Sequence, residues 1–224
     1  MTKIIVESGI VEIGAWAFGN LDFVENAEIA ESVATIGPWA FFDCGRLEKV
    51  KLPDGLILLG DGSFGNCRKL KRVDIPKSVQ VIGWLAFGGS GLKEITVPEG
   101  VTEIGGSAFF GCRNLEEAVI AESVVQIGDF AFSDCGKLTS AVVLGVNTVF
   151  GDDVFSGHSH QFTLYGFEDS SAEGYGAEWQ IPFAYIAEPV PTGDITGSIS
   201  TLMKLVYMLM KLIRYNSNQV ALSL

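Results

Sequence analysis

Apolar residues recur at a fixed interval along most of the chain and form no single long amphipathic run. Seven times an apolar residue is followed by glycine, and a phenylalanine stands four positions after that glycine. The glycines are Gly14, Gly37, Gly60, Gly83, Gly105, Gly128 and Gly151, and the phenylalanines are Phe18, Phe41, Phe64, Phe87, Phe109, Phe132 and Phe155. Successive phenylalanines are 23 residues apart, except for one step of 22. Self-similarity at such a period indicates a repeat architecture.

Each unit contains two sets of positions that face inward. Apolar residues two apart, as in Leu47-x-x-Val50-x-Leu52, predict a short strand with one buried face, and residues 70–75 repeat the pattern. Proline lacks the N–H that a strand ladder needs, so it ends three of these strands, at Pro53, Pro76 and Pro98. A second pair of apolar positions predicts the opposite wall: Val33 and Ile36, Val79 and Ile82, Val101 and Ile104, and Val124 and Ile127.

The segment after each glycine, such as Ala40-Phe41, is expected to form about one helical turn that places the phenylalanine in the core. One repeat cannot bury its own apolar face, whereas stacked repeats bury it continuously. Each phenylalanine should then pack on the next at about 4.8 Å, the strand spacing. Crossovers between parallel strands are almost always right-handed. The sequence therefore predicts a right-handed α/β solenoid with a parallel β-sheet face, helical turns on the other wall, and about seven coils over residues 1–160.

These units resemble the BspA-like leucine-rich repeat, which reads Leu-x-x-Val-x-Ile-Pro-x-x-Val-x-x-Ile-Gly-x-x-Ala-Phe-x-x-Cys. The resemblance covers about residues 4–155. It implies a leucine-rich-repeat solenoid, a surface or secreted protein, and an adhesive or protein-binding role. Residues 1–7 hold no signal peptide, because Glu7 interrupts the apolar run. An extracellular location is thus expected from the resemblance alone, and a cytoplasmic one is the alternative.

Residues 161–188 resemble the unit that closes such stacks. There a strand, a short helix with Ala172-Glu173-Gly174-Tyr175 and a final strand at Ile181-Pro182-Phe183 are expected to cover the last coil. At the other end the stack begins part-way through a repeat. A bare first strand would invite aggregation, so a fragment of a longer protein is the favoured interpretation.

Residues 189–224 are expected to form a linker and a hydrophobic helical tail. The helix, from Ile199 to Tyr215, is rich in Leu and Met, so its apolar face should pack on the solenoid or mediate self-association. The segment from Gly193 to Ile199 is similar to the opening of a dockerin calcium loop. It lacks the second and third oxygen ligands, so calcium binding is not expected.

Charge and sequence motifs argue against several classes of function. The net charge of −12 argues against nucleic acid and anionic membranes, which need clustered Lys and Arg. No apolar run reaches the roughly 18 residues of a membrane span. The sequence contains no nucleophile elbow, P-loop, metalloprotease motif or dinucleotide fingerprint, so neither an enzyme nor a cofactor is expected.

Four cysteines share one slot, three residues after the phenylalanine: Cys44, Cys67, Cys112 and Cys135. Small buried hydrophobes with free thiols are expected there, because a disulfide between equivalent positions of stacked coils would be strained. His158 and His160 lie near Asp152 and Asp153, which raises a metal site as an alternative. Zinc needs three or four convergent ligands, and His158 also fills the cysteine slot, so no metal is predicted.

Two surfaces are candidates for a partner. Side chains between the inward positions of the strands point out of the sheet, and this face turns apolar toward its C-terminal half. The candidate face comprises Lys49, Lys51, Arg72, Asp74, Glu94, Thr96, Glu117, Val119, Ser140 and Val142. Trp16 and Trp39, with Phe130 in the same row, suggest either a carbohydrate-stacking strip or partly buried packing, which is favoured.

A non-catalytic binding or adhesion module is therefore the expected function, with an unknown protein or cell-surface ligand on the solenoid face. The alternatives are a scaffold or spacer without a ligand of its own and a degenerate dockerin-type assembly protein.

Overall fold

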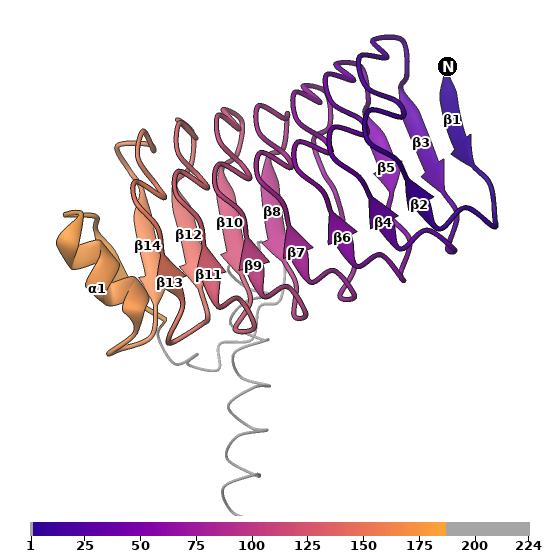
Figure 1. Cartoon of the computed structure of the whole chain (residues 1–224). Coiled ribbons are helices and arrows are strands. Elements are labelled where there is room, and N and C mark those ends of the chain that lie inside the picture. Colours follow the sequence, from indigo (N-terminus) through magenta and orange to yellow (C-terminus); the bar gives the residue numbers. More distant parts are fainter. Residues whose placement is uncertain (1, 187–224) are drawn as a thin grey trace, which may run out of the picture. The chain divides into compact units, whose positions relative to one another are not determined.

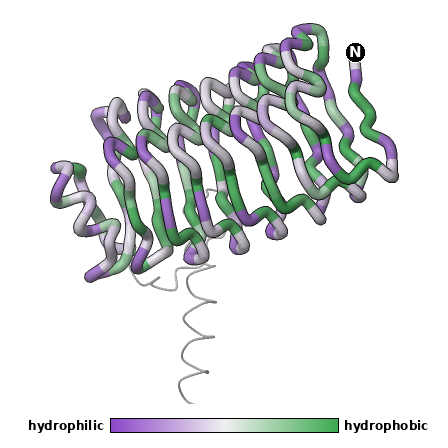
Figure 2. The backbone as a smooth tube through the Cα atoms, in the orientation of Figure 1, coloured by the Kyte–Doolittle hydropathy of each residue, from purple (hydrophilic) through white to green (hydrophobic). Residues whose placement is uncertain are grey.

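The computed structural model describes residues 2–186. The chain divides into two compact units, Met1–Tyr185 and Ile186–Leu224, and everything below concerns the first. The expected linker, the helix at Ile199–Tyr215 and the calcium-like segment all lie outside the described residues. Within the first unit, parallel strands recur in successive coils, as the repeat pattern predicts, and apolar residues recur at the same place in each coil (Figures 1 and 2).

One wall of the coils is a continuous seven-stranded parallel sheet of two-residue strands, called here the short-strand wall. Its strands are β2 (Glu12–Ile13), β4 (Thr35–Ile36), β6 (Leu58–Leu59), β7 (Val81–Ile82), β9 (Glu103–Ile104), β11 (Gln126–Ile127) and β13 (Val149–Phe150). Ile36, Ile82 and Ile127 are fully buried. The second inward-facing set predicted from the sequence is thereby confirmed.

The longer strands form the sheet face, which is split into two parallel sheets (Figure 1). The three-stranded sheet contains β1 (Lys3–Val6), β3 (Asn26–Ile29) and β5 (Lys49–Lys51). The five-stranded sheet contains β8 (Glu94–Val97), β10 (Glu117–Ile120), β12 (Ser140–Val143), β14 (Thr163–Gly166) and β15 (Phe183–Tyr185).

The strand predicted over residues 70–75 is not formed, and this break separates the two sheets. Val73 and Ile75 still face the core, so the repeat keeps its place in the stack. Like charges at Lys49 and Arg72 do not explain the break, because Glu94 and Glu117 are equally like-charged and still pair in register. The coil after the break is also the one that is a residue shorter than the others.

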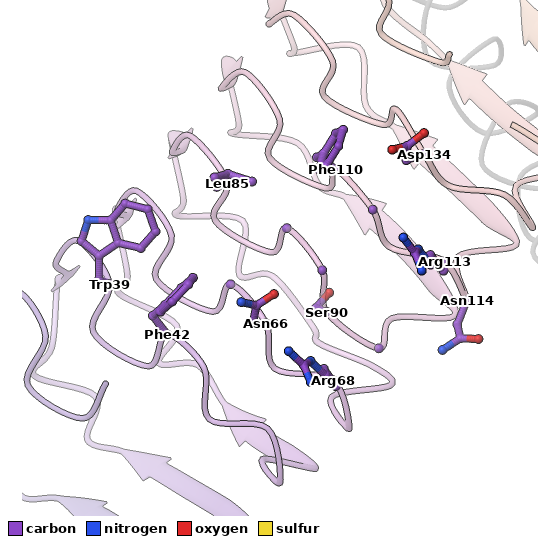
Figure 3. Close-up of a pocket in the computed structure, with 15 residues that line it drawn as sticks. Trp39, Phe42, Asn66, Arg68, Leu85, Ser90, Phe110, Arg113, Asn114 and Asp134 are labelled. Atoms are coloured by element: carbon purple, nitrogen blue, oxygen red, sulfur yellow. The ribbon is translucent and has the colours of Figure 1, made fainter. Parts of the chain in front are cut away.

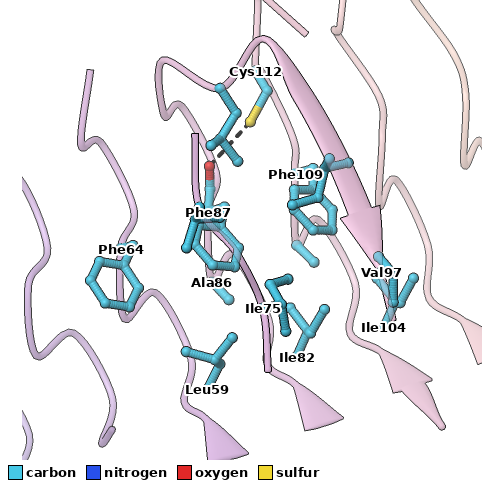
Figure 4. Packing of buried hydrophobic residues seen from close by; sticks show 14 of the residues in the cluster. Leu59, Phe64, Ile75, Ile82, Ala86, Phe87, Val97, Ile104, Phe109 and Cys112 are labelled. Carbon is cyan, nitrogen blue, oxygen red and sulfur yellow. Dashed lines mark hydrogen bonds between the residues drawn. The ribbon is translucent and has the colours of Figure 1, made fainter. Parts of the chain in front are cut away.

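The phenylalanines form the predicted ladder through the core (Figure 4). Ring centroids of successive phenylalanines from Phe18 to Phe155 lie 4.9–5.6 Å apart, and all six pairs are stacked. Phe41 and the later members are fully buried, whereas Phe18 is partly buried. Offset stacking at this separation is favourable beyond the burial of apolar area. The ladder is therefore weakest at its first coil.

The third wall, called here the turn wall, corrects the expectation of helical turns. The residues after each glycine form consecutive turns, and Trp39 and Asp43 have positive φ values of 59° and 54°. The N–H of Phe42 donates to Trp39 O of its own coil at 3.1 Å, whereas the N–H of Phe41 donates to Ser63 O of the next coil at 2.8 Å. The turn wall is thus hydrogen-bonded from coil to coil, which a helical turn would prevent because its N–H groups bond within the coil.

The cysteines lie behind this wall and are buried and free, as expected. Each thiol donates to the phenylalanine carbonyl of the preceding coil, for example Cys112 Sγ to Phe87 O at 3.1 Å (Figure 4). Burial raises the pKa of the Cys112 thiol to about 11. Because only the thiolate is a strong nucleophile, these side chains serve packing and coil-to-coil bonding.

The last coil is covered by β14, α1 (Ser171–Glu178) and β15. Ser170 caps α1 by accepting from the N–H of Glu173, whose carboxylate in turn accepts from the N–H of Asp169 at 2.8 Å. Tyr175 of α1 stacks on Phe150 with centroids 4.7 Å apart, and its hydroxyl accepts from the buried N–H of Val154 at 2.9 Å. Through these contacts the cap covers Phe150 and provides a hydrogen-bond acceptor for the buried N–H of Val154 in the last coil.

Candidate binding surfaces

The sheet face carries all ten residues of the candidate partner-binding face in two rows. Along the ladders, Glu94 lies opposite Glu117, which lies opposite Ser140, and Thr96 lies opposite Val119, which lies opposite Val142. Lys49 and Lys51 are in β5, and Arg72 and Asp74 are in the unpaired segment between the two sheets. The N-terminal half is exposed and charged, as the sequence indicates.

The C-terminal half of this face differs from the expectation. Val119 is only 5% exposed, and Val142 is half-buried. Thr96 and Val142 stand directly on either side of Val119 at the strand spacing, so β-branched side chains pack against it along the sheet. The expected exposed valine patch is therefore wrong at Val119.

A groove of about 1020 Å³ lies on the N-terminal half, where the strands are interrupted. It is called here the sheet-face groove, and it is formed by β3, β5 and residues 69–77. Its basic residues are Lys49, Lys51, Lys69, Lys71, Arg72 and Lys77, and its acidic residues are Glu28, Glu48, Asp54 and Asp74. Six of the 15 Lys and Arg residues of the chain thus line one groove, which is basic on balance in a chain of net charge −12.

Ion pairs fix part of this groove. Lys51 Nζ lies 3.0 Å from Glu31 Oε1, and the other Glu31 oxygen accepts from the N–H of Asp54 at 2.8 Å. The backbone hydrogen bond from Asp54, followed by the one from Lys51, lowers the pKa of Glu31. Arg72 contacts Asp74 at 3.2 Å and Glu94 at 3.7 Å. Exposed pairs of this kind contribute little to stability, so they mainly position the side chains.

Other cations of the sheet-face groove are not neutralised. Within residues 2–186, Lys49, Lys71 and Lys77 have no carboxylate oxygen within 4.0 Å. They remain available to an anionic group of a partner.

A second groove, of about 670 Å³, crosses the turn wall and was not predicted from the sequence (Figure 3). We call it the turn-wall groove. Its floor is the glycine-rich turn from Gly88 to Gly91, and its aromatic rim is formed by Trp39, Phe42 and Phe110. The lining also includes Leu85 and the polar side chains of Asn66, Arg68, Arg113, Asn114 and Asp134. The signal in the sequence was the one short repeat, which falls at these glycines.

The tryptophans lie at one end of this wall and pack on one another. Trp16 stacks on Trp39 with centroids 5.7 Å apart, and Trp84 meets Trp39 edge-on at 5.8 Å. Trp39 also lies against Gly62, where a Cβ would overlap its ring. Both faces of Trp39 are therefore occupied, which is the partly buried packing favoured from the sequence. Trp16 remains 50% exposed.

Phe130 does not join these rings, because Gly62, Leu85 and Ser107 fill the intervening coils of its row. A continuous aromatic strip is therefore absent. Trp84 and Phe42 do contact Trp39, but they occupy other positions of the repeat, so the row of Trp16, Trp39 and Phe130 did not predict them.

His158 packs against its neighbours at the end of the last repeat. His158 Nδ1 lies 2.8 Å from Ser159 O, and its ring packs on Phe162 with centroids 4.6 Å apart. No group of three or more His, Cys, Asp or Glu side chains within residues 2–186 is arranged to hold a metal ion. No helix in the same range has the length and apolarity to cross a bilayer.

Known structures share this fold. A Treponema pallidum leucine-rich-repeat protein is 27% identical with a TM-score of 0.68, over 81% of this chain and 85% of that one. A leucine-rich-repeat protein from Bacteroides ovatus is 24% identical with a TM-score of 0.62, over 82% of this chain and 60% of that one. The pneumococcal vaccine antigen PcpA is 17% identical with a TM-score of 0.55, over 74% of this chain and 42% of that one.

The chain thus spans about 60% of the Bacteroides ovatus protein and less of the pneumococcal antigen. No curated protein matches it. The model of the BspA type leucine-rich repeat region, with six copies, matches residues 1–116 and 42–163. Together with the stacked parallel coils and the phenylalanine ladder, this match shows that the chain belongs to the BspA-type leucine-rich-repeat family.

Proposed function

We propose that the chain is a non-catalytic binding or adhesion module of a surface or secreted protein, and that it holds a protein ligand in the sheet-face groove. The observation that carries this proposal is the set of unneutralised lysines, Lys49, Lys71 and Lys77, in the sheet-face groove. Solenoids commonly bind partners through such extended faces.

The charge of the groove indicates the kind of partner. Lys49 and Lys71 are exposed, and the carboxylates of Glu31 and Glu48 pair with other lysines, Lys51 and Lys69. Opposite charge across an interface speeds association and sets specificity more than it raises affinity. A protein with an acidic segment therefore fits this groove best, and its binding should weaken with salt.

The test compares the wild-type chain with Lys49→Ala/Lys71→Ala and with the control Lys137→Ala, an exposed lysine outside the groove. Each is immobilised and exposed to a panel of purified extracellular proteins with low isoelectric points. We expect the double variant to lose at least tenfold in affinity, with the control unchanged and all three equally stable.

Equal binding by the double variant would remove the sheet-face groove from the proposal. A wild-type chain that binds no member of the panel would favour the alternative, a scaffold or spacer without a ligand of its own.

A further inference from the structure

The turn-wall groove lies where two successive coils carry glycine in place of a large side chain. The position after the ladder phenylalanine is Phe42 in one coil and Phe110 three coils later, but it is Gly65 and Gly88 in the two coils between. The shortened turn from Gly88 to Gly91 deepens the hollow, and the two rings stand at its ends (Figure 3).

Close contacts with the preceding coil exclude larger residues from two positions of this floor. Gly91 lies so close to the preceding coil that a Cβ would overlap the carbonyl oxygen of Arg68. Gly89 has a φ of +66°, and a Cβ there would lie 2.5 Å from Asn66 Oδ1. Any larger residue at these positions would strain the turn, so the hollow is a fixed feature of the stack.

The floor offers no donor to a peptide backbone. The N–H of Gly88 donates to Leu85 O at 2.9 Å, that of Gly89 to Phe110 O at 2.7 Å, and that of Gly91 to Cys67 O at 3.1 Å. Strand addition, the usual way to bind an extended peptide, needs free backbone groups at the site. Recognition in this groove therefore depends on the side chains of its rim.

Those side chains combine aromatic rings with guanidinium and amide groups. Phe110 is 37% exposed and makes no ring contact within residues 2–186. Arg113 has no carboxylate within 4.0 Å in the same range, and Arg68 reaches only Asp43, at 4.0 Å. Asp134 is the one carboxylate of the lining. The rim is thus cationic on balance and rich in planar polar groups.

This combination suits a sugar with a carboxylate. The apolar face of a pyranose ring packs on an aromatic ring, planar amides and guanidinium groups bond to its hydroxyls, and arginine pairs with a carboxylate in bidentate geometry. Three coil spacings of about 4.8 Å place Phe42 and Phe110 about 14 Å apart, the length of a short oligosaccharide. Two arginines and one aspartate in the lining are too few cations for the series of phosphate contacts that a nucleic acid needs.

We propose that the turn-wall groove is a binding site for an acidic oligosaccharide, separate from the protein-binding face. In this site Phe110 and Phe42 stack on sugar rings, Arg68 and Arg113 bind carboxylates, and Asn66 and Asn114 bond to hydroxyls. The turn-wall groove and the sheet-face groove lie on different walls and share no lining residue, so variants can test one groove without altering the other.

The experiment measures binding of two acidic probes, a galacturonic acid trimer and sialyllactose, by calorimetry and ligand-observed NMR. Their neutral counterparts, maltotriose and lactose, are the matched controls. We expect at least one acidic probe to bind at least tenfold more tightly than its neutral counterpart, with an affinity that falls as salt rises. The two probes distinguish a uronic acid from a sialic acid as the preferred sugar.

Variants of the full chain locate the site. Phe110→Ala and Arg68→Gln/Arg113→Gln should each reduce affinity at least tenfold while the thermal unfolding midpoint stays near that of the wild type. Phe130→Ala, an exposed ring outside the groove, and Lys49→Ala/Lys71→Ala on the sheet face should change nothing. Equal binding of the neutral sugars, no binding of either acidic probe at low millimolar concentration, or unchanged affinity in the arginine variant overturns the proposal.

Discussion

Ser90 Oγ lies 3.3 Å from Cys112 Sγ, at the one coil in which serine replaces the recurring cysteine. The Cys112 thiol also donates to Phe87 O at 3.1 Å, and the equivalent thiols of Cys44, Cys67 and Cys135 make the same contact to their own preceding coils. Ser90 shows that the slot accepts a hydroxyl in place of a thiol. The natural substitution provides a conservative variant for testing what the thiols do.

The first prediction concerns alkaline pH. Burial raises the pKa of Cys112 from about 9 to about 11, so the folded state holds the proton more tightly than the unfolded state. The resulting stability is complete below pH 9 and is lost as the pH rises toward 11, about 3 kcal/mol in all. Thermal unfolding of wild type and Cys112→Ser between pH 8 and 11 should show a smaller alkaline loss in the variant. Parallel curves would show that this thiol does not titrate with folding.

The second prediction concerns the phenylalanine ladder. Phe64→Ala or Phe87→Ala should lower the free energy of unfolding by about 3–5 kcal/mol, because each leaves a cavity in the middle of the core. Phe18→Ala should lower it clearly less, since Phe18 is only partly buried. Urea denaturation followed by circular dichroism measures the three values. Equal losses would contradict a ladder that weakens at its first coil.

The third prediction concerns the cap. Tyr175→Phe removes the hydroxyl that accepts from the buried N–H of Val154, and leaving that donor unsatisfied should cost about 1–3 kcal/mol. Tyr165→Phe in β14 is the matched control, with an expected change within about 0.5 kcal/mol. If Tyr175→Phe is as stable as this control, the hydrogen bond does not contribute to the stability of the cap.

The fourth prediction concerns the domain boundary. Met1–Tyr185 forms a compact unit of its own, so deletion of residues 193–224 should leave the repeats folded, with the far-ultraviolet circular dichroism of the strands retained. Loss of cooperative unfolding in the truncated chain would mean that the tail is integral to the fold. The same truncated chain, compared by light scattering with the full chain, tests self-association through the tail.

The period of glycine and phenylalanine predicted the stack, its two strand walls and its ladder, because a residue that recurs every 23 positions must meet its own copies in a stacked coil. The break over residues 70–75 was not predictable from that period, because Val73 and Ile75 keep the apolar pattern and are buried although this segment forms no strand. A pattern of inward residues specifies which side chains are buried, and it does not specify whether the backbone between them pairs with the next coil.

The candidate site was predicted in part. Alternation along strands placed the ten face residues on one wall, yet it could not show that Val119 is flanked closely by Thr96 and Val142. A substitution at Val119 would therefore report on packing, and Lys49 and Lys71 are the better positions for testing a partner. The turn-wall groove was not predicted because its floor consists of glycines. Glycines in a turn are ordinarily attributed to the backbone conformation that the turn requires, and not to a binding site.

The position two residues after each repeat glycine has a left-handed backbone in every coil, from Trp16 and Trp39 through Leu85, Ser107 and Phe130 to Asp153. Side chains as different as an indole, a hydroxyl and a carboxylate occupy it, because the conformation is imposed by the hydrogen bonds that join neighbouring coils and not by the residue itself. The side chains that the turn wall presents can therefore be replaced by mutation one coil at a time, while the stacked core keeps its structure.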